Sequence, residues 1–329
     1  MLNALPIIII NSEGLTVSSK LLIATLALSS IFLAPTANAG QVLNTGDISI
    51  GVQDFGALGF SSVGLSHLGG DAITPGCLCE GWGASFGSTA GWSANDNGGN
   101  SNVSLVNFTG TSSSATSIVS VANALQVTQA YTASASSSLF VDKVTLTNTT
   151  SASISDVRYS RSMDWDVPPT PFSEFVTINR GTSTALLFSN DNGFATPNPL
   201  ANPAELVSGT TNVNFADSGP NDHGAYFTFS FGALAAGESK TFNIFYGAAD
   251  NEANAFSALS KVGAEVYSLG QSNTAGGPSA GTPSTFIFAF SGVGGTPVSA
   301  VPEPETYAML LAGLSLVGFA ARRRKQNQA

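Results

Sequence analysis

Phenylalanine recurs at every second residue in two segments of this chain, and this alternation restricts the fold more than any other feature. The first segment spans residues 227–231, and the second spans residues 286–290. Successive side chains of a β-strand point to opposite faces, so the spacing places the three rings of each segment on one face. The chain must therefore form strands whose aromatic faces are buried against another layer.

The residues between such segments are of the kinds that form turns. The sequence contains 35 glycines, and only 10% of its residues are charged, so Lys and Glu, which favour helices, are scarce. Its 21 phenylalanines supply more apolar area than a disordered chain carries. The composition therefore favours strands joined by Gly, Asn and Ser turns.

Alternation predicts three antiparallel strand pairs, each joined by a turn. In chain order they are residues 143–147 with 154–165, 175–178 with 184–188, and 226–231 with 242–246. The glycine-rich residues 69–91 and the proline-rich residues 195–224 are expected to be loops.

One soluble helix is expected late in the chain, over residues 252–269. Apolar residues recur there every three or four positions, Asp250 or Asn251 can cap its start, and Gly270 is a natural stop. The predicted fold is mainly β: an antiparallel β-sandwich with one late α-helix, or a jelly roll as the nearest alternative.

The N-terminal segment, residues 1–39, is predicted to be a signal peptide. An apolar run over residues 21–33 precedes Ala37-Asn38-Ala39, which fits an A-x-A cleavage site, so the mature chain would begin at Gly40. We therefore expect export through the Sec pathway and cleavage by signal peptidase. An uncleaved membrane anchor is the alternative.

The C-terminal segment has three parts in a fixed order. Val301-Pro302-Glu303-Pro304 is followed by an apolar run over residues 307–321, and Arg322-Arg323-Arg324-Lys325 closes the segment. The prolines keep the first part extended, whereas about 17 helical residues reach roughly 25 Å, the short end of a bilayer span. We expect a transmembrane helix whose basic end stays cytoplasmic; a plain anchor and a buried core helix are the alternatives.

Together these three parts resemble the PEP-CTERM sorting tail of exported bacterial proteins. The resemblance covers residues 301–325 and implies cleavage near the Pro-Glu-Pro motif by an exosortase, a membrane-embedded transpeptidase-like enzyme. It also implies a transient inner-membrane anchor, followed by the cell surface, outer envelope or extracellular space. Such tails are associated with bacteria that produce exopolysaccharide, which suggests a role in the matrix or biofilm and polysaccharide as a partner.

The two terminal segments delimit a β-sandwich domain over residues 40–290 and a linker over residues 291–300. Residues 40–300 hold six basic and 18 acidic residues, a net charge near −12. An acidic surface of this kind repels phosphates, so nucleic acid is excluded as a partner. It favours solubility and the approach of divalent cations.

Few residues suit catalysis. The two histidines, His67 and His223, have unrelated local contexts, and no Gly-x-Ser-x-Gly elbow is present. A Ser-His-Asp triad built on His223 is an alternative to a turn histidine, and the turn is favoured. We therefore expect no catalytic residues and no cofactor.

Two short motifs leave several interpretations open. Asp164 and Asp166 lie two residues apart on one strand face. They could be a solvated strand end, a calcium site together with Asp156 or Glu174, or the acid/base pair of a glycosidase. Cys77 and Cys79 are expected to form a disulfide in an oxidising compartment, with free thiols or metal binding as alternatives.

Three classes of function follow from these patterns. We expect a non-catalytic surface or matrix protein, sorted by an exosortase. The alternatives are a carbohydrate- or calcium-binding module that uses Trp82, Trp92 or Trp165, and a secreted hydrolase. Exposed, coplanar tryptophan rings would favour sugar binding, whereas a cleft with converging carboxylates or His223 would favour hydrolysis.

Overall fold

The computed structural model describes residues 40–278, 280–299 and 311–315. Residues 40–299 form two large antiparallel sheets, a small sheet and one helix, which confirms the mainly β prediction. The nine-stranded sheet has the order β15 (Phe215–Asn221), β13 (Glu174–Asn179), β18 (Val266–Ser272), β19 (Thr285–Ser291), β17 (Ser239–Ala249), β11 (Leu139–Asn148), β10 (Leu125–Ala133), β9 (Ser114–Val121) and β8 (Val103–Thr111).

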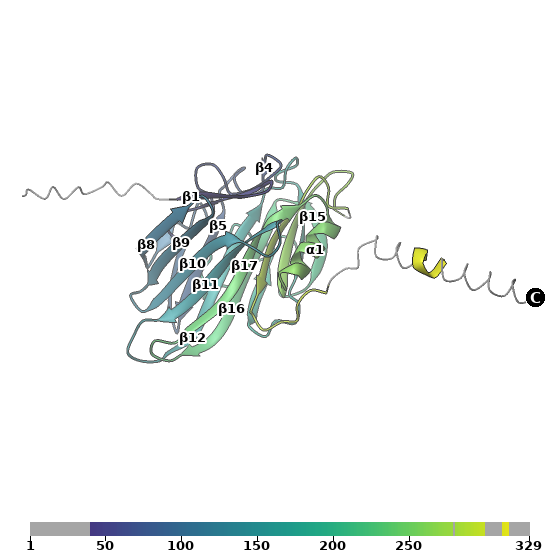
Figure 1. The fold of residues 1–329 in the computed structure, drawn as a ribbon. Coiled ribbons are helices and arrows are strands. Elements are labelled where there is room, and N and C mark those ends of the chain that lie inside the picture. The colour runs from purple at the N-terminus through teal and green to yellow at the C-terminus, as the bar shows by residue number, and fades with distance from the viewer. Residues whose placement is uncertain (1–39, 279, 300–310, 316–329) are drawn as a thin grey trace, which may run out of the picture. The chain divides into compact units, whose positions relative to one another are not determined.

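The second large sheet has six strands, and a four-stranded sheet lies across one end of the two (Figure 1). The six-stranded sheet has the order β14 (Leu186–Asn190), β16 (His223–Leu234), β12 (Ile154–Trp165), β5 (Glu80–Phe86), β6 (Thr89–Ala94) and β7 (Asn100–Ser101). The small sheet has the order β1 (Gln41–Thr45), β2 (Ile48–Val52), β3 (Leu65–His67) and β4 (Gly70–Asp71).

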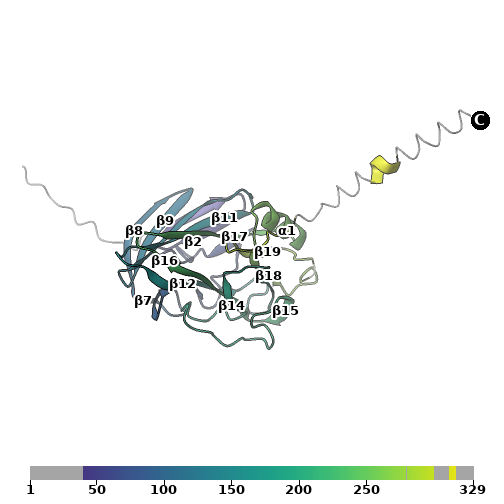
Figure 2. The same cartoon turned by 90° about the horizontal axis from the view of Figure 1, so that it is seen from below.

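The two large sheets pack face to face as a sandwich (Figure 2). The alternating phenylalanines of β16 and β19 meet in this core, where the Phe227 ring centroid lies 5.5 Å from that of Phe288 and 5.2 Å from that of Phe290. Both alternating segments therefore turn their rings toward each other across the two layers, as the spacing predicts.

The three predicted strand pairs are wrong, although their strands are present. β11 and β12 belong to different sheets, as do β13 and β14, and β16 and β17. Each intervening turn crosses from one layer to the other, so consecutive strands bury their apolar faces across the core without sharing hydrogen bonds. Alternation fixes which face of a strand is buried but does not select its neighbour.

Two predicted loops also contain strands. The glycine-rich residues 69–91 include β4, all of β5 and the beginning of β6, and the proline-rich residues 195–224 include β15. Small residues allow β5 and β6 to be covered closely: a Cβ added at Gly83 would lie 1.9 Å from the carbonyl oxygen of Pro197. Glycine there permits close packing of a backbone segment and does not mark a loop.

The helix is shorter than predicted. α1 (Glu252–Lys261) begins at the N-cap Asn251, whose side chain accepts from the Asn254 backbone N–H, and Gly263 follows its end with a φ of +64°. The predicted continuation to residue 269 is wrong, because residues from Val266 onward form β18. Every residue of this strand is buried, so its apolar residues need not alternate with polar ones. Their spacing can therefore resemble that of a helix.

The helix covers the outer face of the nine-stranded sheet. Figure 2 shows α1 against this sheet, and Ala255, Ala258 and Leu259 pack with Phe245 and Ile287 in a cluster separate from the central core. α1 therefore belongs to a second, smaller hydrophobic cluster.

The chain stays attached to the domain after its last strand. The carboxylate of Glu265 accepts from the N–H groups of Gly292, Val293 and Gly295, and the N–H of Val298 donates to the carbonyl of Ala264 at 2.7 Å. The predicted linker, residues 291–300, thus includes a docked portion that extends to Val298.

Both terminal signals fall largely outside the described residues. This applies to Ala37 and Ala39, to the motif Val301-Pro302-Glu303-Pro304, and to the basic residues Arg322-Arg323-Arg324-Lys325. Residues 311–315, inside the expected transmembrane segment, are helical. In the described part of the chain, no helix has the length and apolar character needed to cross a membrane.

Candidate functional site: a buried acidic cluster at the end of β12

The last residues of β12 divide between two faces. Trp165 points into the core, where its ring is fully buried and its Nε1–H donates to Ser268 Oγ at 3.0 Å. Asp164 and Asp166 therefore share the opposite face, as their spacing predicts. They are 1% and 0% exposed, so the interpretation as a solvated strand end is wrong.

This outer face is buried because a loop covers it. Ser160 donates to the carbonyl of Pro197, and the Asn97 amide donates both to Ser162 Oγ at 3.0 Å and to the carbonyl of Ala195 at 3.1 Å. The loop that follows β14 is thus held against β12 by polar contacts.

A third carboxylate joins the pair from the junction of β15 and β16. Carboxylate oxygens of Asp164, Asp166 and Asp222 lie within 4.8 Å of one another, and Asp222 is exposed. The register of the sheet explains this meeting, because Trp165 pairs with His223, the residue that follows Asp222. Sequence spacing does not reveal Asp222, since its proximity depends on which strand lies beside β12.

Most of the buried oxygens in the cluster have no hydrogen-bond donor. Oδ1 of Asp164 and both carboxylate oxygens of Asp166 are buried without a partner. The Sγ atom of Cys77 lies 3.7 Å from Oδ2 of Asp164, but this sulfur is in a disulfide and has no proton to donate. Unpaired buried carboxylates are rare in folded proteins.

Glu174, the first residue of β13, is a buried neighbour whose oxygens are occupied. Its carboxylate accepts from the backbone N–H groups of Ser173 and His223, each at 3.0 Å. Burial raises the pKa of Glu174 to about 8, with the Asp222 and Asp166 charges adding to the effect. Its hydrogen bonds hold the carboxylate in place beside the cluster.

The electrostatics of the cluster reflect burial and repulsion between like charges. Burial, together with the nearby Asp166 and Asp222 charges, raises the pKa of Asp164 to about 9. Burial also raises the pKa of Asp166 to about 7, again with a contribution from Asp222. Such a group of carboxylates must hold protons or a cation near neutral pH.

The cysteines lie beside this cluster. The structure joins Cys77 and Cys79 in a disulfide, and the carbonyl of Cys79 accepts from the Asp164 N–H at 2.9 Å. The disulfide loop therefore packs against the end of β12 and leaves no thiolate there for metal binding.

His223 does not form the triad considered from the sequence. Its Nδ1 lies 3.1 Å from Asp191 Oδ2, in a fully buried pair, and its Nε2 has no hydrogen-bond partner. A nucleophilic hydroxyl on Nε2 would be required for acyl transfer, and none of the described residues supplies one.

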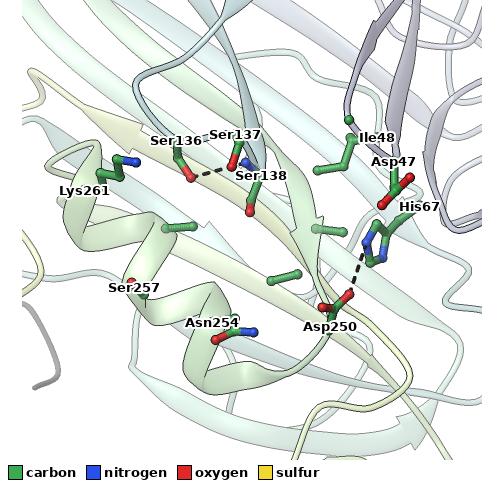
Figure 3. A pocket seen from close by; sticks show the side chains of 14 residues that line it. Asp47, Ile48, His67, Ser136, Ser137, Ser138, Asp250, Asn254, Ser257 and Lys261 are labelled. Carbon is green, nitrogen blue, oxygen red and sulfur yellow. Dashed lines mark hydrogen bonds and ion pairs between the residues drawn. The ribbon is translucent and has the colours of Figure 1, made fainter. Parts of the chain in front are cut away.

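His67 makes serine and carboxylate contacts that the sequence did not predict. Its Nδ1 lies 2.8 Å from Ser284 Oγ, and its Nε2 lies 3.7 Å from Asp250 Oδ1. The ring faces a polar groove of about 380 Å³ bounded by α1 and the loop 136–138 (Figure 3). Ser284 is buried and does not line the groove, so its hydroxyl is not presented to a substrate there.

Two of the three tryptophans cannot present rings to a sugar. Trp82 is fully buried in β5, where it stacks on Tyr159 and donates its Nε1–H to the carbonyl of Phe55 at 2.7 Å. Trp165 is equally buried, and Trp92 is half-buried in β6. The coplanar exposed rings expected of a sugar-binding face are therefore not formed by these residues.

Comparison with known proteins identifies the tail and leaves the domain without a match. Residues 300–325 match the model of the PEP-CTERM protein-sorting motif. No curated protein matches the chain. The C-terminal tail is thus a PEP-CTERM sorting motif, which indicates an exported protein that is sorted by an exosortase.

Proposed function

We propose that the protein is a non-catalytic component of the bacterial cell surface or extracellular matrix, associated with exopolysaccharide or biofilm. The match of residues 300–325 to the sorting motif carries this proposal. In this account, the Sec pathway exports the chain, signal peptidase removes residues 1–39, and exosortase cuts near Pro302-Glu303-Pro304 after a transient stay in the inner membrane.

The attachment of residues 292–298 supports an intact domain after processing. These residues are held by the Glu265 carboxylate and by the Ala264 carbonyl, and all of them precede the motif. A cut near residues 302–304 would therefore leave every described strand of the domain in the released product. The domain boundaries we propose are residues 40–290 for the sandwich, 291–300 for the connection and 301–325 for the tail.

The arrangement of the histidines supports a non-catalytic role. His223 is buried and paired with Asp191. The Ser284 hydroxyl that contacts His67 does not line the groove beside α1. We therefore expect no turnover on glycoside, ester or peptide substrates by the purified protein. Hydrolysis that is lost in His223→Ala or His67→Ala would instead identify a secreted hydrolase.

A second candidate function is binding of carbohydrate in the polar groove beside α1. Its walls carry the serine hydroxyls of residues 136–138 and the side chains of Asn254, Ser257 and Lys261 (Figure 3). Such groups can hydrogen-bond to sugar hydroxyls. Loss of retention on the host polysaccharide in Asn254→Ala would support this surface, whereas unchanged retention would exclude it.

Substitution of the two motif prolines tests the proposed sorting. We expect Pro302→Ala/Pro304→Ala to accumulate as an unprocessed, membrane-bound chain, because the segment before the helix would no longer be held extended. Pro297→Ala, which lies outside the motif, is the matched control and should be processed normally. Immunoblotting of membrane and medium fractions measures the processing. Normal release of the double variant into the medium would contradict exosortase recognition of this motif.

A further inference from the structure

The acidic cluster at the end of β12 has no role in sorting, yet its atoms form an oxygen-only ligand set. We propose that Asp164, Asp166 and Asp222 bind one calcium ion, with Glu174 fixed beside them. This inference goes beyond the proposed surface role and does not depend on it. Three independent features of the structure support it: geometry, unpaired charge and donor chemistry.

The geometry fits one ion. Calcium lies about 2.3–2.6 Å from each oxygen ligand, so two oxygens on the same ion are at most about 5 Å apart. One oxygen from each of the three aspartates lies within 4.8 Å of the other two. The three carboxylates can thus share an ion without movement of the strands that carry them.

The buried oxygens lack any other source of compensation. Asp166 is 0% exposed, and neither of its oxygens has a hydrogen-bond donor; Asp164 is 1% exposed, and its Oδ1 has none. In the described residues, the arginine ion pairs join Arg158 to Asp156 and Arg161 to Glu80. The histidine pairs join His67 to Asp250 and His223 to Asp191, and none of these pairs includes a carboxylate of the cluster. A carboxylate buried without a partner is strongly unfavourable, and a bound cation removes this penalty.

The donor chemistry selects a hard cation. The nearby sulfur atoms are in the disulfide. The ligand atoms that lie within 4.8 Å of one another are carboxylate oxygens of Asp164, Asp166 and Asp222, and this group includes no ring nitrogen of the adjacent His223. Such an oxygen set suits calcium better than zinc or copper. Magnesium requires shorter bonds and a strict octahedron, so a site spread over two strand ends favours the larger ion.

An ion at this position would join parts of both large sheets. Asp164 and Asp166 come from the end of β12 in the six-stranded sheet, whereas Asp222 directly follows β15 of the nine-stranded sheet. Glu174 begins β13, the partner of β15, and accepts from the first N–H of β16. Calcium would thus stabilise the junction between the two layers.

Thermal unfolding of the full chain in detergent, after treatment with EDTA, tests the site. We expect millimolar calcium to raise Tm by about 5 °C or more, because a ligand that binds only the folded state stabilises it. Equilibrium dialysis with calcium should give one ion per chain. Magnesium at the same concentration should have a smaller effect; an equal or larger magnesium effect would overturn the assignment to calcium.

Matched variants locate the effect. Asp166→Asn and the exposed Asp222→Asn should each lose most of the calcium-induced rise in Tm. Asp156→Asn removes one acid at the opposite end of β12, at a φ of +50° that asparagine tolerates, and should keep the full rise. Because Asp222 is exposed, its substitution leaves the core unchanged. A calcium response that persists in Asp222→Asn, or no response in the unmodified protein, would overturn the proposal.

Discussion

The two faces of β12 both carry buried charged side chains, but these side chains are paired on one face and largely unpaired on the other. On the core side, Arg161 is fully buried and donates to the carboxylate of Glu80 and to Gln129 Oε1, while Glu80 also accepts from the Leu58 N–H. On the outer side, Asp164 and Asp166 are equally buried, but most of their oxygens have no donor. A closed network, whose charged groups are paired, serves stability, whereas the open one at Asp164 and Asp166 leaves oxygens free for the proposed calcium ion.

The largest expected effect on stability comes from breaking the ion pair between Arg161 and Glu80 on the core side. Arg161→Met should destabilise the protein by about 3–5 kcal/mol, because it leaves the Glu80 carboxylate buried without its cation. Denaturant unfolding monitored by tryptophan fluorescence measures this loss. Glu80→Gln/Arg161→Met should recover part of it, and a single-variant loss below about 1 kcal/mol would mean that the network is not closed in solution.

One carboxylate on the core side departs from this pattern and allows a pH test. Asp142 is fully buried, neither of its oxygens has a hydrogen-bond partner, and burial raises its pKa to about 7 although the Arg161 charge opposes the shift. Since its folded-state pKa lies above the unfolded value near 4, stability should fall as pH rises from about 4 to about 7.

Asp142→Asn isolates this contribution. The variant should gain stability relative to the unmodified protein with rising pH, by at most about 4 kcal/mol, and the gain should level off above about pH 7. Urea unfolding from pH 4 to pH 8 measures it. A gain that is constant across this range would show that the Asp142 carboxyl keeps an ordinary pKa in the folded protein.

Removing one acid from the open cluster should have the opposite sign from opening the core network. In EDTA, Asp166→Asn should stabilise the protein by about 1–3 kcal/mol, because it removes a buried charge that has no partner. Urea unfolding at pH 8, with Asp156→Asn as the control, measures the difference. A destabilisation as large as that of Arg161→Met would erase the distinction between the two faces.

The smallest effect is expected from the disulfide. Joining residues two positions apart closes a very short loop, so Cys77→Ser/Cys79→Ser should cost less than about 2 kcal/mol. Thiol counting on denatured, unreduced protein accompanies the unfolding measurement. Two free thiols in freshly exported protein would contradict the predicted bond.

The sequence predicted which face of each strand is buried better than it predicted which strands are hydrogen-bonded neighbours. Period-two alternation correctly placed Trp165 in the core and Asp164 and Asp166 together on the other face. It failed to pair the strands, because a turn of a few residues can either reverse a strand within a sheet or cross to the opposite sheet. Hydrogen-bond partners are therefore a property of the whole fold.

The missing parts of the candidate site have the same cause. Asp222 reaches the cluster only because β16 lies beside β12, and Ser284 reaches His67 only through the packing of β19 near the small sheet. Neither contact leaves a local pattern in the sequence. The predicted helix extended past its observed end for a related reason. The strand that follows is buried on both faces, so its sequence has no alternation that would distinguish it from a helix.

Mapping the termini of the exported protein by mass spectrometry tests the central claim most directly. We expect an N-terminus at Gly40 and a C-terminus near residues 302–304, with no peptide from the apolar segment 307–321. A released protein that retains Arg322-Arg323-Arg324-Lys325, or one that begins at Met1, would contradict processing as a sorted surface protein.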